Sequence, residues 1–194
     1  MAENDKNSIR SLKNRFPTKT LVTMALMSAI SIVLSRFCVI YFTQSLRLSF
    51  GNIPILITGL LFGPIAGAVV GAGTDILGSV ISGLGWYPPL TLTPVIMGVA
   101  AGLFRGFVLK RRTYLRILPV TLTANTLGTI CWSTYWLSRL YGNPLWTLLS
   151  VRAPFYIGIA LLEALVIFIL FKAKVFNPIL RDSKYMKKVN GSEH

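Results

Sequence analysis

The sequence predicts an all-α integral membrane protein with six transmembrane helices, and three observations support this fold class. Of the 194 residues, 53 % are apolar and only 13 % are charged, a composition typical of membrane proteins. Apolar segments recur along the chain at lengths that can cross a bilayer. The Lys and Arg residues cluster between these segments and not on one amphipathic face, so the net charge of +14 indicates membrane topology and argues against nucleic-acid binding.

The length of each apolar segment sets the predicted helices, because about 20 apolar residues cross a hydrocarbon core of about 30 Å. The six helices are expected near residues 18–38, 52–63, 64–84, 91–110, 113–139 and 146–172. The second segment is short and runs into Gly63-Pro64. Since proline is tolerated in the first turn of a helix, we expect a tight turn between the second and third helices.

Positive charge predicts which helix ends face the cytoplasm, because short cytoplasmic loops retain Lys and Arg. If both termini are inside, all but four of the 20 basic residues lie in or beside the tails or in the loop between the fourth and fifth helices. We therefore predict cytoplasmic tails at residues 1–17 and 173–194, around a membrane domain of residues 18–172.

The four remaining basic residues lie on the predicted outer side, and all are arginines: Arg36, Arg47, Arg139 and Arg152. The planar guanidinium group binds carboxylate or phosphate through two parallel hydrogen bonds, whereas lysine offers a point charge. These arginines predict an outward-facing anion site. The alternative is contact with lipid phosphates, or snorkelling from helix ends.

Two of the six acidic residues, Asp75 and Glu163, fall within predicted helices. A charged side chain at the membrane centre costs about 2.5–3.5 kcal/mol on insertion scales, so each acid needs a partner. Asp75 belongs either to an outer pocket or to a helix–helix contact. For Glu163 we expect a structural pair with a polar group of the fifth helix, such as Asn125 or Thr123.

Aromatic residues concentrate on the predicted outer side, where an interfacial belt explains many of them. A belt does not explain the glycine-flanked connection GLGWYPP, which carries Trp86, Tyr87 and Pro88. It predicts a stiff aromatic flap that can stack on a planar ligand.

Motifs for catalysis and metal binding are missing from the sequence. It contains no GxxxxGK[ST], HExxH or GxSxG pattern, its two cysteines form no CxxC, and its only histidine is His194. We therefore predict that the protein is not an enzyme and uses no metal or cofactor. A membrane enzyme would need a catalytic constellation, and a channel would show a polar stripe along several helices.

Three short segments, in this order and spacing, resemble the substrate-binding S components of energy-coupling-factor (ECF) vitamin transporters, in particular the folate type. They are FGNIPI at 50–55, LFGP at 61–64 and GTDILG at 73–78. The resemblance implies a compact S-component bundle in a bacterial cell membrane. Such a protein binds its vitamin from outside and passes it to a transmembrane coupling subunit and two cytoplasmic ATPases. Pantothenate, riboflavin, pyridoxine and hydroxymethylpyrimidine remain alternative ligands.

The resemblance also implies positions for the two binding surfaces. An AxxxA step in the first helix, here Ala25 and Ala29, would pack on the coupling subunit. The ligand cavity would lie between helices four to six, gated by residues 38–51 and 83–90. Folate has a flat pterin, an aromatic spacer and a tail with two carboxylates, which call for aromatic rings, an acid or amide, and arginine. The expected ligand-binding residues are Arg36, Arg47, Asp75, Trp86, Tyr87, Pro88, Thr91, Asn125, Trp132, Arg152 and Tyr156.

Overall fold

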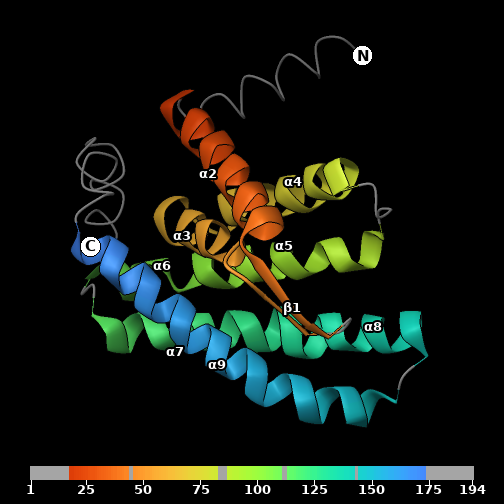
Figure 1. Cartoon of the computed structure of the whole chain (residues 1–194). Coiled ribbons are helices and arrows are strands. Elements are labelled where there is room, and N and C mark those ends of the chain that lie inside the picture. The colour runs from red at the N-terminus through yellow and green to blue at the C-terminus, as the bar shows by residue number, and fades with distance from the viewer. Residues whose placement is uncertain (1–17, 44–45, 83–86, 111–112, 143, 174–194) are drawn as a thin grey trace, which may run out of the picture.

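The described part of the chain folds into a bundle of helices with a short β-hairpin after the first helix (Figure 1). The computed structural model describes residues 18–43, 46–82, 87–110, 113–142 and 144–173. Its elements are α2 (Thr18–Phe37), β1 (Val39–Thr43), β2 (Leu46–Ser49), α3 (Asn52–Phe62), α4 (Pro64–Ser82), α5 (Pro88–Leu103), α6 (Arg105–Lys110), α7 (Tyr114–Asn125), the π-helix η1 (Thr126–Ser133), α8 (Thr134–Tyr141) and α9 (Leu145–Lys172).

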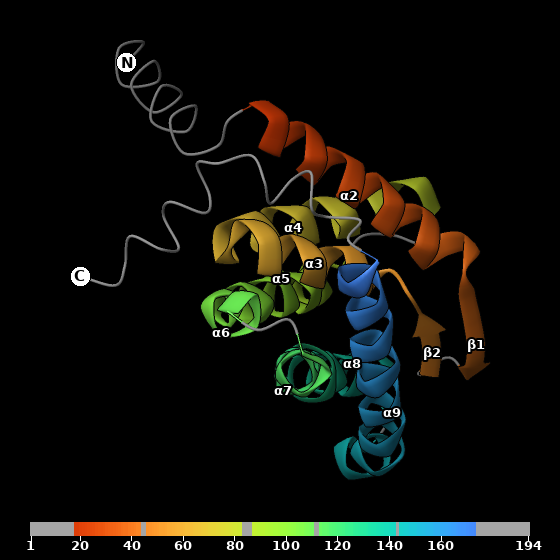
Figure 2. The same cartoon turned by 90° about the vertical axis from the view of Figure 1, so that its left-hand side faces the viewer.

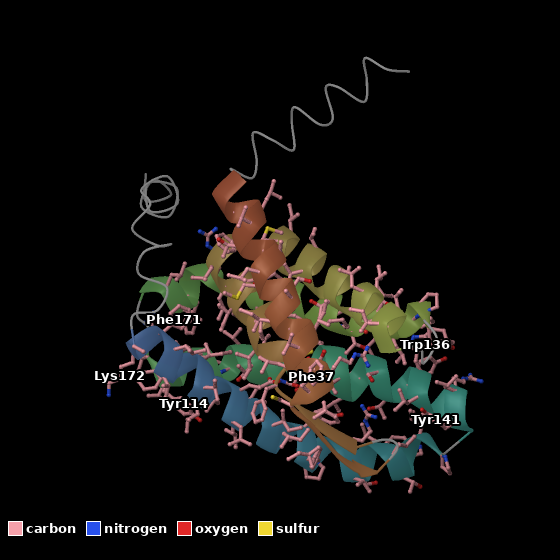
Figure 3. The ribbon with its side chains drawn as sticks, turned by 45° about the horizontal axis from the view of Figure 1, so that its top comes forward. Phe37, Tyr114, Trp136, Tyr141, Phe171 and Lys172 are labelled. Carbon is pink, nitrogen blue, oxygen red and sulfur yellow. The ribbon has the colours of Figure 1, made fainter. Side chains whose placement is uncertain are left out.

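The bundle has two ends, which differ in what they contain. Figure 3 shows Tyr114, Phe171 and Lys172 together at one end, and Trp136 and Tyr141 at the other. We call the first the basal end, where α2, α4 and α7 begin and α3, α5 and α9 end. The opposite end is the apical end.

The predicted turn between the second and third helices is confirmed. Gly63 has a φ of 101°, which glycine adopts without the steric cost that a Cβ would bring. Its N–H donates to the Gly59 carbonyl at 2.9 Å and so closes α3. Pro64 then opens α4, where the missing N–H leaves no helical hydrogen bond unmade.

Glycines let α4 lie directly on α5 in the basal half. A Cβ on Gly98 would sit 2.3 Å from the Gly67 carbonyl oxygen, and one on Gly67 would sit 2.4 Å from the Gly98 carbonyl oxygen. One turn further along, a Cβ on Gly71 would sit 2.5 Å from the carbonyl oxygen of Pro94. No side chain fits between backbones this close, so this row of glycines packs the bundle.

Two of the predicted helices are interrupted in the structure. The fourth begins earlier than expected, because Pro88 and Pro89 form the first turn of α5, and it breaks at Phe104 before α6. The fifth runs as α7, η1 and α8, with its middle wound as a π-helix. Among the described residues, α2, α4 and α9 are long and apolar enough to cross a membrane, and α3 and α5 are shorter apolar helices.

The hairpin between α2 and α3 was not predicted from the sequence. β1 and β2 pair antiparallel, with Val39 opposite Ser49 and Ile40 opposite Leu48, and Figure 2 shows β2 on the side of α9 and β1 outside it. Leu48 packs against a small apolar cluster of Ile130, Tyr156 and Ile159. The hairpin is thus held by contacts with η1 and α9.

Candidate ligand-binding site

A cavity of about 400 Å³ lies between the helices in the apical half. Most of the side chains in its wall are polar. They come from α2, β2, α3, α4, α5, η1, α8 and α9. They are Ser31, Ser35, Arg36, Ser49, Asn52, Thr74, Asp75, Ser79, Thr93, Thr129, Ser133 and Arg152, joined by the rings of Tyr87, Tyr141 and Tyr156.

A layer of polar residues crosses the middle of the bundle, and four of them, Asn52, Thr74, Asp75 and Thr93, line the cavity and form its floor. α2, α3, α5, α7 and α9 each place one such residue, and α4 places two, about ten positions from the basal end of the helix. Ten residues span about 15 Å at 1.5 Å per residue, which is half of a ~30 Å apolar core. The residues of this polar layer are Ser28, Asn52, Thr74, Asp75, Thr93, Asn125 and Glu163. Hydrogen bonds join several of them, for example Ser28 to Thr74 at 3.2 Å between the hydroxyl oxygens.

Glu163 is fully buried in this layer. Asn125 donates to its Oε2 at 2.6 Å, and Asn52 donates to its Oε1 at 3.2 Å. The expected pairing of Glu163 with Asn125 is confirmed. Asn125 also donates to the Thr121 carbonyl at 3.0 Å, is 1 % exposed and does not line the cavity. The structure therefore places this candidate ligand residue beneath the floor.

The two arginines Arg36 and Arg152 both line the cavity. Arg152 is 2 % exposed, and its Nη2 donates to the Ser133 hydroxyl at 3.4 Å. Its guanidinium carbon lies 5.0 Å from the centre of the Tyr156 ring. A buried arginine held in this way presents a fixed positive charge to the cavity.

Arg36 reaches the cavity from the end of α2. A Cβ on Gly78 would lie 3.1 Å from its Nη2, so this glycine leaves room for the guanidinium against α4. Arg36 Nε is buried and finds no hydrogen-bond partner among the described residues. Of the other outer arginines, Arg139 is exposed over the Tyr135 ring, and the side chain of Arg47 lies outside the part that the structure describes.

Asp75 lines the cavity and also joins two helices. Thr91 donates its hydroxyl hydrogen to Asp75 Oδ2 at 2.7 Å, which ties α4 to the start of α5. Both expectations for this acid, a pocket wall and a helix contact, are therefore compatible with its position.

An aromatic cluster holds the start of α5 against η1 and α8. Trp132 donates its indole N–H to the Pro89 carbonyl at 2.7 Å, and its ring lies 6.1 Å from Trp136. Tyr87 meets Trp136 edge-on at 6.3 Å. In this group Tyr87 lines the cavity, whereas Trp132 and the exposed Pro88 do not; Trp86 lies outside the described residues.

Several cavity residues were missed by the sequence analysis, among them Asn52, Thr93 and Ser133. The sequence analysis included Asn52 only as part of the FGNIPI segment and assigned it no role. The Thr93 hydroxyl is buried with no partner in the described ranges, and it lies two positions from the predicted Thr91. Ser133 ends η1, and π-helical turns are frequent at functional sites, but no pattern in the sequence marks one here.

Comparisons with known proteins identify the family. Residues 19–172 match the model of the ECF transporter, substrate-specific component. The folate transporter FolT of Clostridium novyi (strain NT) is 33 % identical over 133 residues, which cover 68 % of this chain and 76 % of that protein.

Solved structures of S components have the same fold. A crystal structure of FolT bound with folic acid superposes with a TM-score of 0.68 at 28 % identity, over 79 % of this chain and 92 % of the other. The S component of a bacterial ECF transporter gives a TM-score of 0.62 at 26 % identity, over 83 % and 97 %. These matches confirm the predicted multi-pass bundle of the S-component type and, with it, a role in transport and not in catalysis. The chain belongs to the family of ECF transporter substrate-specific components.

Proposed function

We propose that this protein is the folate-binding subunit of an ECF importer in a bacterial cell membrane. The observation that carries the proposal is the cavity, whose wall contains Arg36 and Arg152 as well as an acid and tyrosine rings. The relatives described as FolT, one of them crystallised with folic acid, support folate over the other vitamins.

The cavity offers a counterpart for each part of folate. Arginine suits the two carboxylates of the tail, the rings of Tyr87 and Tyr156 suit flat rings, and the polar floor suits the donors and acceptors of the pterin. Arg36 Nε and the Thr93 hydroxyl have no partner in the described chain. Because buried polar groups are normally hydrogen-bonded, a bound polar molecule would complete these two.

The proposed topology puts both tails, residues 1–17 and 173–194, in the cytoplasm and opens the cavity to the outside. The distribution of Lys and Arg supports it. The coupling subunit and two ATPases would then complete the importer, because this chain has no phosphate loop of its own.

The proposed docking face for the coupling subunit is the exposed side of α2 with Ala25 and Ala29. Both alanines are exposed, and their neighbours Val22, Leu26 and Val33 are 63 %, 57 % and 52 % exposed. Small residues on an open helix face allow another helix to approach closely.

A ligand screen by thermal melting of the purified protein in detergent tests this function. A ligand at 100 times its Kd stabilises the folded state by about 2.7 kcal/mol, so folate should raise the melting temperature strongly. Pantothenate, riboflavin, pyridoxine and hydroxymethylpyrimidine serve as matched comparisons. A shift with one of these and none with folate would assign the site to that vitamin.

A further inference from the structure

We infer that Asn52 is a specificity residue that accepts hydrogen bonds from N–H groups of the ligand, and that Glu163 acts as a positioning residue by fixing the direction of the Asn52 amide. The inference rests on the proposed folate function and adds the residue that recognises the pterin end of folate by hydrogen bonding. A chain of hydrogen bonds connects a backbone carbonyl to the cavity wall.

The chain starts at Thr121, whose backbone carbonyl can only accept a hydrogen bond. The group of Asn125 that lies 3.0 Å from it must therefore be the NH₂ group. The same NH₂ group lies 2.6 Å from Glu163 Oε2. The direction of the Asn125 amide is thus set by the backbone, and Glu163 Oε2 is an acceptor.

Glu163 passes this direction on to Asn52. Hydrogen bonds from two amides favour the ionised form of Glu163, in which both oxygens accept, and Asn52 Nδ2 donates to Oε1 at 3.2 Å. Glu163 is fully buried, so its hydrogen bonds are made with neighbouring side chains. The two residues lie 111 positions apart in the chain, yet one decides how the other is turned.

With one N–H of its amide bonded to Glu163, Asn52 keeps its carbonyl oxygen Oδ1 as an acceptor for the cavity, beside the second N–H of the same amide. Asn52 lines the cavity and is partly exposed, and no residue in the described ranges donates to its Oδ1. The floor therefore presents a hydrogen-bond acceptor at this point. Its complement on the ligand is an N–H donor, such as the 2-amino group or ring N–H of a pterin.

The position of Asn52 relative to Arg152 fits an elongated ligand. Arg152, Tyr156, Ile159 and Glu163 follow one another at spacings of four, three and four, so they share one face of α9. Arg152 lies eleven residues from Glu163, about 16 Å along a helix. A ligand with donors at one end and carboxylates at the other can use both sites at once.

An exchange of the acid and the amide tests the inference. In Glu163→Gln the new oxygen can still accept from Asn125, but the new NH₂ group can only donate to Asn52. Asn52 should then turn over and present its own NH₂ group to the ligand donors. We expect folate to bind about 10- to 100-fold more weakly, from the usual loss for one unmet buried group.

The double variant Asn52→Asp with Glu163→Gln restores the acceptor. The aspartate accepts from Gln at 163 with one oxygen and offers the other to the cavity, with the net charge unchanged. We expect folate affinity to return to within a few-fold of wild type. A role of Glu163 in packing alone would not predict rescue by this exchange.

Each variant is measured by folate titration beside an unliganded melting curve. A folate analogue with methyl in place of the 2-amino group is the second probe; Glu163→Gln should change its affinity much less than that of folate. Thr123→Val is the matched control, since that hydroxyl bonds to the Val120 carbonyl of its own helix, and it should bind folate as wild type does.

The outcomes separate the inference from the proposed function. A wild type that does not bind folate overturns both. A wild type that binds folate, together with a folded Glu163→Gln that binds folate and the analogue unchanged, overturns the inference alone. If Glu163→Gln does not fold, Asn52→Ala decides the matter: it should erase the preference for folate over the analogue, and a preserved preference rejects the role of Asn52.

Discussion

The basal and apical halves of this bundle are built from the same six apolar segments, but the basal half packs tightly and the apical half encloses a polar cavity. In the basal half, fully buried side chains such as Leu56, Leu60, Ile117 and Ile167 form an apolar core, and glycines bring α4 and α5 into backbone contact. In the apical half, the same helices turn serine, threonine and arginine toward a cavity. Because apolar packing and backbone contact concentrate in the basal half, the apical half can keep polar groups around a cavity.

The strongest test of this difference between the halves is a substitution that disrupts packing in the basal half alone. Gly98→Leu should lower the melting temperature of the unliganded protein by roughly 10 °C or prevent folding, since overpacking costs about 3 kcal/mol or more where backbone lies on the far side. Melting in detergent measures the effect. Gly158→Ala is the control, because a Cβ at Gly158 meets nothing within 4 Å and alanine favours the helix. Equal melting temperatures for Gly98→Leu and wild type would contradict the close contact.

A change in the apical half should act on the ligand first. Arg152→Ala should weaken folate binding by on the order of 100-fold, because a ligand carboxylate would lose a buried charged partner. Arg152→Lys should recover only part of this, since the two-pronged geometry is lost. Calorimetric titration measures the affinities, with Arg139→Ala as the exposed control. An unchanged Kd in Arg152→Ala would remove this residue from the site.

Asp75 lines the cavity and also joins α4 to α5, so Asp75→Asn distinguishes a role in ligand binding from a role in helix packing. The amide keeps an oxygen that can accept from Thr91, so we expect the unliganded melting temperature to stay within a few degrees of wild type. Folate affinity should fall about tenfold, as for the loss of one charged hydrogen bond. The opposite pattern, a lower melting temperature with intact affinity, would assign Asp75 to the helix contact.

Substitutions on the exposed surface of α2, away from both the basal core and the cavity, should have the smallest effect on the isolated protein. Ala29→Leu should leave folate affinity and melting temperature unchanged, yet it should abolish folate uptake by cells that contain the whole importer. Gly158→Leu adds bulk to an exposed position of α9 and should keep uptake. Normal uptake in Ala29→Leu would move the docking face away from this helix.

Local patterns were sufficient to predict much of the basal half. The six apolar segments were located to within a few residues, and the turn at Gly63-Pro64 follows from two residues with strong conformational preferences. The pair of Glu163 and Asn125 was also predictable, since a buried acid needs a partner. These features depend on chemistry that can be read from short stretches of chain.

The missed features depend on contacts between distant residues. The strands of the hairpin are five and four residues long, too short for a periodic signal, and Leu48 is held by residues of η1 and α9. The π-helical winding of residues 126–133 has no local marker. Asn52 could be placed in a motif, but the direction of its amide follows from an acid far along the chain.

The hairpin also limits how deeply the molecule can lie in a bilayer. A two-stranded sheet has unpaired N–H and C=O groups along both outer edges, and such groups cannot face hydrocarbon. The strands β1 (Val39–Thr43) and β2 (Leu46–Ser49) must therefore be shielded by protein or lie in water or among lipid head groups. Wherever η1 and α9 do not cover the edges of these strands, the apical end has to stand at or above the level of the lipid head groups.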